Sequence, residues 1–307
     1  MTVVDRYAPS PTWQLHLGNL RTALAGWLLT RAAGGRWLMR IEDLDQSRVA
    51  AAPGCANQQL DELHRLGLDW DGGVMWQSQR AAAYDSALAQ LADRTYECFC
   101  TRREIRQAAS APHDDGYRPY PGTCARLSSE QAARLREHRP AALRIRAEQA
   151  EFSIQDEQAG KVTGVIDDFV LARNDGQIAY NLAVVVDDIA QGVTRISRGA
   201  DLLSSAPRQA WLTTLLGSPA PTYAHIGLVS DTEGTRLAKR HASATMADLA
   251  SRGFDTAAVM AMLSASLGLD AHDTAQAALA EFSSQGPSAA FWRPARWDET
   301  TLRLLPA

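Results

Sequence analysis

Apolar residues recur along the first forty positions in two different rhythms. Val3 and Val4 form a short apolar run that predicts a strand, and prolines at positions 9 and 11 end it. Leucines at positions 17, 20, 24 and 28 are three or four residues apart, which predicts an amphipathic helix. The pair Gly34-Gly35 ends that pattern, and residues 37–41 predict a buried strand. A strand, a helix and a strand in immediate succession indicate a parallel sheet with a right-handed crossover.

The alternation of helical and strand patterns continues along the chain. Short strands are expected between residues 141 and 169, and further strands at residues 193–196 and 223–229. Helices are expected at residues 58–66, 81–91, 207–216, 257–267 and 274–282. We therefore predict an α/β fold in which a parallel sheet is built in two halves, with an insertion between them and a small helical region at the end.

Length and composition agree with a globular chain. The chain has 307 residues, of which 46% are hydrophobic, and a formal net charge of −4. No apolar run reaches the length of a membrane helix, and residues 1–6 lack a secretory pattern, so we expect a cytoplasmic protein with no membrane partner. We expect a monomer.

The slightly negative charge argues against a broad, nonspecific grip on nucleic acid. A local basic face would suffice for RNA, and a solvated arginine-rich face accounts for the same residues equally well. The candidates for that face are Arg134, Arg136, Arg139, Arg144 and Arg146.

The turn between the first strand and the first helix carries the first candidate chemistry. It reads Arg6-Tyr7-Ala8-Pro9-Ser10-Pro11-Thr12-Trp13-Gln14-Leu15-His16-Leu17-Gly18-Asn19. Such a junction places backbone N–H groups and the positive end of a helix dipole where a phosphate can bind. His16 and Asn19 would add neutral donors, and Gly18 would let a ligand approach the backbone. A structural turn with a surface histidine explains the stretch by itself equally well.

Two further stretches place charge at a structural boundary, and a third is apolar. Residues 40–45 place acids, among them Glu42, at the end of the second strand, where a ligand site or a solvated edge is expected. Arg198 follows a strand and is a natural partner for a carboxylate, because a guanidinium can bind it in two places. Residues 178–188 read by composition as a buried apolar segment.

Three cysteines are gathered in the most irregular part of the chain. Cys98, Cys100 and Cys124, together with Tyr120, fit a tetrahedral zinc site or a set of free thiols. Tyrosine is an uncommon fourth ligand for zinc, and His113 is a candidate substitute.

Several of these stretches resemble class I aminoacyl-tRNA synthetases of the glutamyl type. Residues 9–12 and the tetrapeptide His16-Leu17-Gly18-Asn19 resemble the first signature, and residues 234–241 resemble the Lys-x-Ser-Lys loop. Arg-Ile-Glu-Asp-Leu-Asp at residues 40–45 and the Tyr-Asn element at residues 180–188 resemble further family motifs. The resemblance covers residues 3–241 and implies a Rossmann-like catalytic domain with halves at residues 1–97 and 169–241, an insertion of the acceptor type at 98–168, and a helical region at 242–307 without an anticodon-binding domain.

The resemblance also implies a role for each motif residue. His16, Gly18, Asn19 and Lys239 would bind ATP, and His16, Asn19 and Lys239 would act in catalysis. The zinc ligands would be Cys98, Cys100, Tyr120 and Cys124. The glutamate-binding residues would be Arg6, Tyr7, Ala8, Pro9, Ser10, Glu42, Tyr180 and Arg198.

Two residues depart from the family pattern. Ala238 replaces a serine and removes a hydroxyl donor. Trp13 replaces a glycine, and it would cost about 1 to 2 kcal/mol if the backbone there needs a positive φ. Neither change removes a main catalytic group, so we expect a working but slower site.

Shortened relatives of glutamyl-tRNA synthetase share the cysteine segment and the Gly-Ala-Asp at residues 199–201. That resemblance implies ATP- and Mg²⁺-dependent activation of L-glutamate, with zinc as a structural metal. It also implies transfer of the glutamyl group to the queuosine base in the anticodon of tRNA(Asp). Two alternatives are a minimal enzyme that charges a tRNA 3′ end and a noncatalytic module that binds glutamate or RNA.

Overall fold

The computed structural model describes residues 2–101, 103–105, 119–148, 150–235, 237 and 244–306. The first half of the chain forms the predicted strand, helix and strand, with parallel pairing of β1 to β2 and of β2 to β3. Its elements are β1 (Val4–Tyr7), α1 (Leu17–Ala32), β2 (Arg36–Ile41), α2 (Gln46–Ala50), α3 (Cys55–Arg65) and β3 (Met75–Trp76). The crossover predicted from the sequence is therefore confirmed, and the short helix α2 is an addition.

The second half supplies the other parallel strands. Strand β9 pairs with β10, and β10 pairs with β6, in both cases in parallel. Its elements are β8 (Val170–Ala172), α7 (Tyr180–Gln191), β9 (Arg195–Gly199), the 3₁₀ helix η3 (Ala200–Ser205), α8 (Ala206–Leu215), β10 (Thr222–Ile226) and β11 (Val229–Ser230). The apolar segment at residues 178–188 is thus the helix α7, which is capped by Gly192 in a left-handed conformation.

The buried carboxylate of Asp5 is one of the groups that join the two halves. Asp5 of β1 is fully buried, and its Oδ1 accepts hydrogen bonds from the backbone N–H of Ser197 (3.1 Å) and of Arg6 (2.8 Å). Its Oδ2 accepts from the Ser197 hydroxyl at 2.5 Å. The neighbouring strands β1 and β9 are therefore tied by a side chain at the point where the two halves meet.

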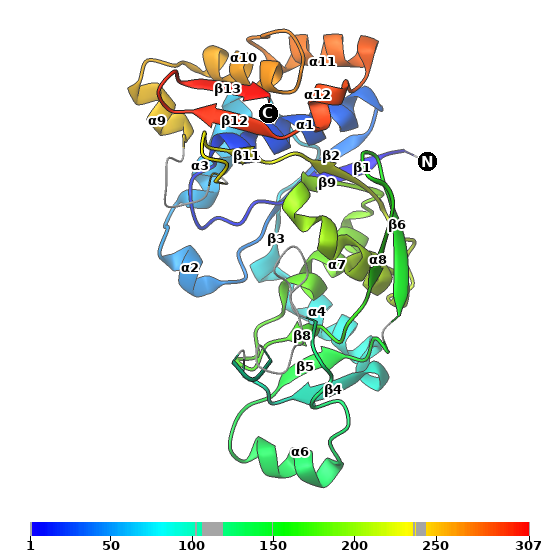
Figure 1. Cartoon of the computed structure of the whole chain (residues 1–307). Helices are drawn as coiled ribbons and strands as arrows, with labels where there is room; N and C mark the ends of the chain where they lie inside the picture. The colour runs from blue at the N-terminus through cyan, green and yellow to red at the C-terminus, as the bar shows by residue number, and fades with distance from the viewer. Residues whose placement is uncertain are drawn as a thin grey trace.

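The chain between β3 and β8 contributes strands to two different sheets. Strands β4, β5 and β8 make a small antiparallel sheet, whereas the hairpin β6–β7 extends the parallel sheet through β10. The elements are the 3₁₀ helices η1 (Gln77–Gln79) and η2 (Ala92–Arg94), α4 (Ala81–Gln90), β4 (Thr95–Cys98), α6 (Ser129–Arg136), β5 (Ala142–Ile145), β6 (Glu151–Asp156) and β7 (Gly160–Val165). Figure 1 shows α6 at the end of the molecule that is farthest from the C-terminal elements.

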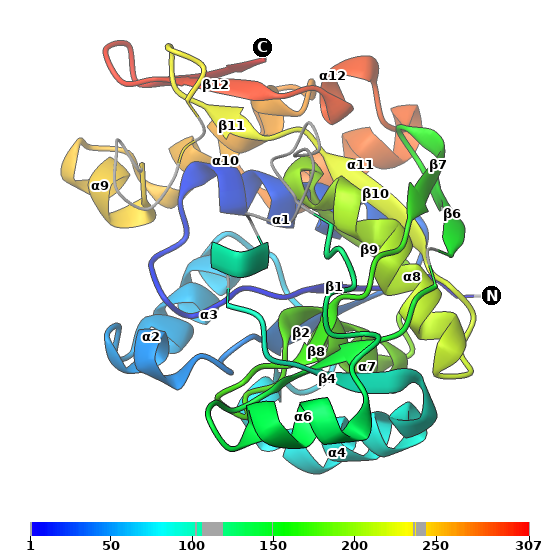
Figure 2. The same ribbon diagram turned by 60° about the horizontal axis from the view of Figure 1, so that its bottom comes forward.

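The C-terminal region contains helices and a β-hairpin. Its elements are α9 (Met246–Ser251), α10 (Thr256–Ser266), α11 (Ala275–Gln285), α12 (Ala289–Trp292), β12 (Ala295–Asp298) and β13 (Arg303–Pro306). Strand β12 pairs in parallel with β11, and Figure 2 shows α1 between β1 on one side and β11 and β12 on the other. The hairpin is an addition to the helical region expected from the sequence.

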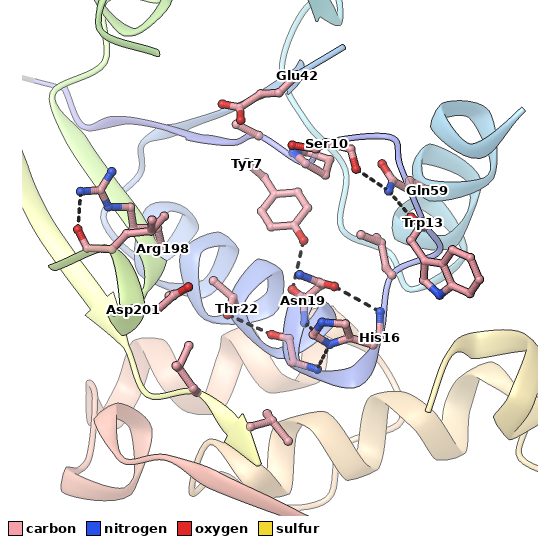
Figure 3. A pocket seen from close by; sticks show the side chains of 18 of the residues that line it. Tyr7, Ser10, Trp13, His16, Asn19, Thr22, Glu42, Gln59, Arg198 and Asp201 are labelled. Atoms are coloured by element: carbon pink, nitrogen blue, oxygen red, sulfur yellow. Dashed lines mark hydrogen bonds between the residues drawn. The ribbon is translucent and has the colours of Figure 1, made fainter. Parts of the chain in front are cut away.

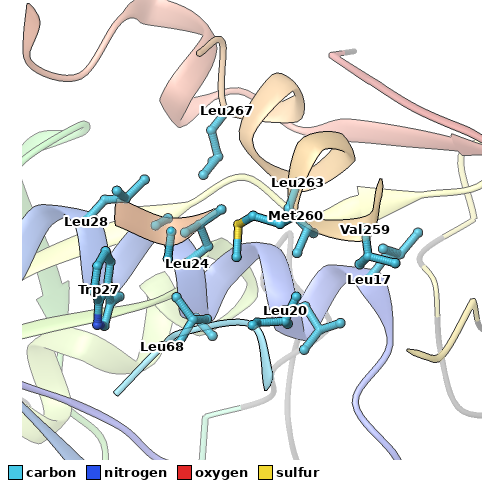
Figure 4. Packing of buried hydrophobic residues seen from close by; sticks show 14 of the residues in the cluster. Leu17, Leu20, Leu24, Trp27, Leu28, Leu68, Val259, Met260, Leu263 and Leu267 are labelled. Atoms are coloured by element: carbon cyan, nitrogen blue, oxygen red, sulfur yellow. The ribbon is translucent and has the colours of Figure 1, made fainter. Parts of the chain in front are cut away.

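Helix α1 is buried on nearly all sides by this arrangement. Leu17, Leu20, Leu24 and Leu28 are completely buried, and Figure 4 shows them against the side chains of α10. The fully buried Arg21 donates to the carbonyl oxygens of Gly227, Ser266, Phe291 and Arg293. The amphipathic helix predicted from the leucines is therefore a central helix between the sheet and the C-terminal region.

None of the helices in the described residues combines the length and the apolar character that crossing a bilayer requires.

Candidate active site

A cavity of about 540 Å³ opens where strands β1 and β9 both end, beside the beginning of α1. Ligands of open α/β sheets bind in this place, beyond the carboxyl ends of the strands. Figure 3 shows Arg198 and Trp13 on opposite sides of the cavity, with Tyr7 and Asn19 between them. The cavity wall includes these predicted site residues: Arg6, Tyr7, Ala8, Pro9, Ser10, His16, Gly18, Asn19, Glu42, Tyr180 and Arg198.

The motifs therefore identified residues that lie in one cavity although they are far apart along the chain. Lys239, the remaining predicted catalytic residue, lies outside the described residues, as do Ala238 and His113. Their predicted roles stay predictions. Leu237, next to them in the chain, does line the cavity.

His16 begins α1 as its N-cap. The Nδ1 atom of His16 accepts from the backbone N–H of Gly18 (3.1 Å) and of Asn19 (3.4 Å), and the Asn19 side chain accepts from the N–H of His16. Because Nδ1 accepts, the proton of the neutral ring is on Nε2. The histidine thus satisfies N–H groups of the helix that we expected to bind a phosphate directly, and a ligand here meets the imidazole ring.

Gly18 is needed by the same cap. A Cβ at this position would lie 3.0 Å from Cε1 and 3.1 Å from Nδ1 of His16. With a side chain at residue 18, the imidazole would have to shift by a few tenths of an ångström from its place over the first turn of α1. The glycine of the His-x-Gly sequence therefore makes room for the cap.

Trp13 sits at the rim of the cavity and is half-exposed. Among the described residues other than glycine, only Glu148 and Leu302 have a positive φ, so the strain considered for Trp13 does not arise. The buried Gln59 holds this loop from α3, since its Nε2 donates to the carbonyl oxygens of Ser10 (3.2 Å) and Trp13 (2.6 Å). Gln59 was not predicted as a site residue, because a glutamine on an amphipathic helix gives no signal of its own.

A buried ion network fixes one side of the cavity. Oδ1 of Asp188 on α7 accepts from Nε of Arg6 at 2.9 Å and from Nη1 of Arg40 at 2.6 Å. Nη2 of Arg40 lies 3.3 Å from Oε1 of Glu42. Two predicted glutamate-binding residues of opposite charge are thus held by the same pair, Asp188 and Arg40. The sequence showed Asp188 only as the second of two acids that close an apolar segment.

The charges of this network shift the pKa values of its carboxyl groups. Burial alone raises the pKa of Asp188, but the charges of Arg40 and Arg6 outweigh it, and the pKa lies below its usual value. Burial raises the pKa of Glu42 above its usual value, although Arg40 and Arg6 act in the opposite direction. Glu42 is therefore a carboxylate whose ionised form would be stabilised by an additional cation in the cavity.

Arg198 lies on the other side of the cavity and is held differently. It is only 6% exposed, and it donates to Nε2 of His225, to Oε1 of Gln209 and to the carbonyl oxygen of Leu202. No carboxylate of the described residues forms a salt bridge with it, and burial lowers the pKa of its guanidinium. A buried cation without an anionic partner favours an anionic ligand.

The three cysteines predicted to bind zinc come together beside the end of β4. Their sulfur atoms all lie within 4.8 Å of one another, with 3.5 Å between Cys100 and Cys124. The Tyr120 hydroxyl lies 3.4 Å from the sulfur of Cys98 and 3.6 Å from that of Cys100. A tetrahedral zinc ion with Zn–S bonds of about 2.3 Å would need sulfurs roughly 3.8 Å apart, so the donor set has a suitable size. The Arg144 guanidinium stacks 3.7 Å above the Tyr120 ring and would offset the negative charge of thiolates.

The arginines considered for a basic RNA face are engaged within the protein. Arg134, Arg136 and Arg139 pair with the acids Glu130, Glu97 and Glu104. Arg144 and Arg146 donate to backbone carbonyl groups and lie over tyrosine rings. Arg134, Arg136 and Arg139 thus form a solvated, ion-paired face, which was the alternative, whereas Arg144 and Arg146 do not belong to it.

Comparison with known proteins gives agreeing results. The family described as tRNA synthetases class I (E and Q), catalytic domain, matches residues 2–291, which runs past the motifs that end at residue 241. A protein from Nocardia farcinica named glutamyl-Q tRNA(Asp) synthetase is 55% identical over 267 residues, which cover 86% of this chain and 84% of that protein. A protein of the same name from Geobacter sulfurreducens is 48% identical over 250 residues, which cover 80% of this chain and 78% of that protein.

Similar solved structures include a glutamate-tRNA synthetase from Elizabethkingia anophelis, with a TM-score of 0.76 and 26% identity. The match covers 92% of this chain but 66% of that synthetase, so the chain spans slightly less than two thirds of it.

Proposed function

Because the chain belongs to the class I tRNA synthetases for glutamate and glutamine, and there to the group named glutamyl-Q tRNA(Asp) synthetase, we propose its reaction as follows. It activates L-glutamate with ATP and transfers the glutamyl group to the queuosine base of tRNA(Asp). The products of the first step are glutamyl-adenylate and pyrophosphate. Those of the second are glutamylated tRNA and AMP.

The observation that carries this proposal is the charge pattern of the cavity. Arg198 is a buried cation with no carboxylate partner among the described residues, and Glu42 is a carboxylate with a raised pKa in the same cavity. L-Glutamate carries one ammonium group and two carboxylates. Its ammonium would bind at Glu42, and its side-chain carboxylate would bind at Arg198. Arg6 would then attract the α-carboxylate, the group that reacts.

The first step joins the α-carboxylate to ATP. An oxygen of the carboxylate attacks the α-phosphorus, a new P–O bond forms, and the bond to the β,γ-diphosphate breaks. His16, at the beginning of α1, would donate from Nε2 to the phosphates, and Asn19 would hold that ring in place. Lys239 would stabilise the charge that develops on the leaving pyrophosphate, and Mg²⁺ would accompany ATP as its usual cation.

The second step transfers the glutamyl group to RNA. A hydroxyl oxygen of the queuosine base attacks the carbonyl carbon of the adenylate, an ester forms, and AMP leaves with the bonding electrons. The hydroxyl proton is released in this step. Bases of a single-stranded anticodon loop can be splayed out into a cavity, which suits this type of substrate.

We propose a structural zinc ion at Cys98, Cys100, Tyr120 and Cys124. The spacing of the three sulfurs and the phenol oxygen supports four ligands around one metal. When bound, zinc would join β4 to the segment at residues 120–124 and supply no catalytic group.

Transfer of labelled glutamate to defined RNAs tests the proposed function. Purified protein, ATP and Mg²⁺ are incubated with tRNA(Asp) that contains queuosine, the same tRNA without queuosine, and tRNA(Glu). Each RNA is prepared with an intact 3′ end and with the terminal adenosine removed. We expect label on the queuosine-containing tRNA(Asp) whether or not the terminal adenosine is present.

The similarity to a glutamate-tRNA synthetase favours one rival, a minimal enzyme that charges a tRNA 3′ end. Label that appears on tRNA(Glu) and disappears with its terminal adenosine would establish that rival. A lack of label on all RNAs, together with glutamate binding, would leave a noncatalytic binding module.

A further inference from the structure

A chain of hydrogen bonds leads from the hairpin β6–β7 to the cavity. Oδ1 of Asp156, at the end of β6, accepts from the backbone N–H groups of Gln158 (3.0 Å) and Ala159 (2.7 Å) in the turn. Its Oδ2 lies 2.7 Å from Nδ1 of His225 on β10. Nε2 of His225 then lies 3.1 Å from Nε of Arg198 on β9. The carboxylate, the imidazole and the guanidinium are all nearly completely buried.

The donors and acceptors in this chain allow one arrangement of protons. Nε of arginine can only donate, so Nε2 of His225 must accept and carries no proton. The ring proton of the neutral histidine is therefore on Nδ1, where it is donated to the Asp156 carboxylate. His225 also stacks on the Tyr223 ring, with the ring centroids 5.7 Å apart and the planes 9° from parallel. The imidazole is thus fixed in both its orientation and its tautomer.

The same bonds decide which way Arg198 presents its donors. A guanidinium has five N–H bonds. Nε–H is used by His225, one N–H of Nη1 by Gln209, and one N–H of Nη2 by the carbonyl of Leu202. Within the described part of the chain, one N–H on each terminal nitrogen remains. Because Arg198 lines the cavity, these two donors are available to a bound carboxylate.

We propose that His225, oriented by Asp156, is a positioning residue that sets the direction of the Arg198 guanidinium and thereby the affinity for the side-chain carboxylate of the substrate. The inference rests on the proposed function, because glutamate is the ligand that it concerns. His225 touches no substrate atom and acts through Arg198. Through this chain of hydrogen bonds, the turn of the β6–β7 hairpin also supports the amino acid site.

Two substitutions separate the roles of the two ring nitrogen atoms of His225, and a third is a control. In His225→Gln the amide oxygen can take the place of Nε2 and accept from Arg198. In His225→Asn the shorter amide can take the place of Nδ1 and donate to Asp156, but it cannot reach Arg198. His64→Asn is the matched control, since His64 is exposed and lies on α3 with an ion pair to Asp69.

Glutamate affinity is measured by calorimetry on the full chain, and KM for glutamate and for ATP by ATP–pyrophosphate exchange. Circular dichroism and thermal melting check that each variant is folded. We expect His225→Asn to weaken glutamate binding about tenfold, because the buried Nε–H of Arg198 loses its acceptor. KM for ATP should be unchanged, and His225→Gln should recover most of the lost affinity.

Two results would overturn the inference in distinguishable ways. If folded His225→Asn and His225→Gln bind glutamate equally well, the orientation of Arg198 does not depend on the acceptor at Nε2, and the inference is wrong while the proposed function stands. If the unaltered chain binds no glutamate, the proposed function and the inference are both wrong. An equal rise of KM for glutamate and for ATP in His225→Asn would show a general structural role and would also overturn it.

Discussion

Two arginines of the described residues, Arg6 and Arg198, line the cavity and have partners of different charge. Arg6 shares the carboxylate of Asp188 with Arg40, so its charge has a partner before any ligand arrives. Arg198 is surrounded by neutral acceptors, namely a histidine, a glutamine and a carbonyl group. The first arrangement stabilises the fold. The second leaves a buried cation that forms no salt bridge with a described carboxylate, so a ligand carboxylate gains more at Arg198 than at Arg6.

The largest expected effect follows from removing the shared carboxylate. Asp188→Asn leaves Arg6 and Arg40 buried together with less negative charge, and we expect the free energy of unfolding to fall by about 3 kcal/mol or more. Urea unfolding followed by circular dichroism measures it. A free energy of unfolding within about 0.5 kcal/mol of that of the unaltered chain would contradict a structural role for the ion pairs of Arg6 and Arg40 with Asp188.

The second effect distinguishes binding from stability. Arg198→Met removes a buried cation that has no carboxylate partner among the described residues, which offsets the loss of its hydrogen bonds to His225, Gln209 and Leu202, so the ligand-free protein should keep its melting temperature within a few degrees. Glutamate affinity should fall at least about 100-fold, because the substrate carboxylate loses its charged partner. Arg6→Met is the matched control and should lower the melting temperature. Equal losses of stability in both variants would remove the distinction between the two arginines.

A third substitution gives Arg198 a carboxylate partner within the protein, as Arg6 already has. Gln209→Glu places a carboxylate at the atom that accepts from Nη1 of Arg198, 2.6 Å away in the present structure. The internal carboxylate would compete with the ligand, so we expect about a tenfold loss of glutamate affinity together with a more stable ligand-free protein. Calorimetry and thermal melting measure the two changes. Unchanged affinity would show that the charge of the ligand is not bound at Arg198.

The smallest effect is one of pH. His225 faces Asp156 from β6, Arg198 from β9 and Asp201 from η3, and it stacks on Tyr223 of its own strand. Burial lowers the pKa of His225 from its usual value of 6.5, although the bond to Asp156 acts in the opposite direction. Protonation would put a proton on Nε2 and a positive charge beside Arg198.

Glutamate affinity should therefore fall as the pH drops below 6.5 and through the lowered pKa of His225, by at most about tenfold per pH unit, since one proton is involved. The stability that the neutral ring contributes follows the same sign: it is present above pH 6.5 and is lost as the pH falls through the lower pKa of the folded state. Glu42, with its raised pKa, titrates in the same direction. His225→Gln separates the two, because its affinity should depend less on pH; identical pH profiles would assign the effect to Glu42.

The sequence predicted local features and motif residues well. The leucine spacing predicted α1, the short apolar runs predicted β1 and β2, and the motifs predicted a common site for Arg6, Glu42 and Arg198. Most residues of that site were predicted from the family resemblance, because a strand–turn–helix junction alone does not indicate a particular ligand. The C-terminal hairpin was missed, since its two strands have four residues each and their pairing is not encoded in a local pattern.

What the sequence did not predict are the partners that hold the site residues. Arg6 and Asp188 are 182 positions apart, and Arg198 and His225 are 27 apart on neighbouring parallel strands. A pattern along the chain reports which face of an element is buried, but not which polar groups meet across the core. The role of His16 was also incompletely predicted, because a histidine N-cap depends on the ring folding back over Gly18.

The position of Arg21 has a consequence for the order in which the chain can fold during synthesis. Its guanidinium binds the carbonyl oxygen of Arg293, 272 residues later in the chain. At about 5–20 residues per second, the ribosome needs on the order of 15–50 s to make that partner after Arg21 has been added. Until then α1, which is buried on nearly all sides in the folded protein, lacks at least part of the C-terminal region that covers it. The first helix to be made is therefore among the last parts of the protein to reach its final surroundings.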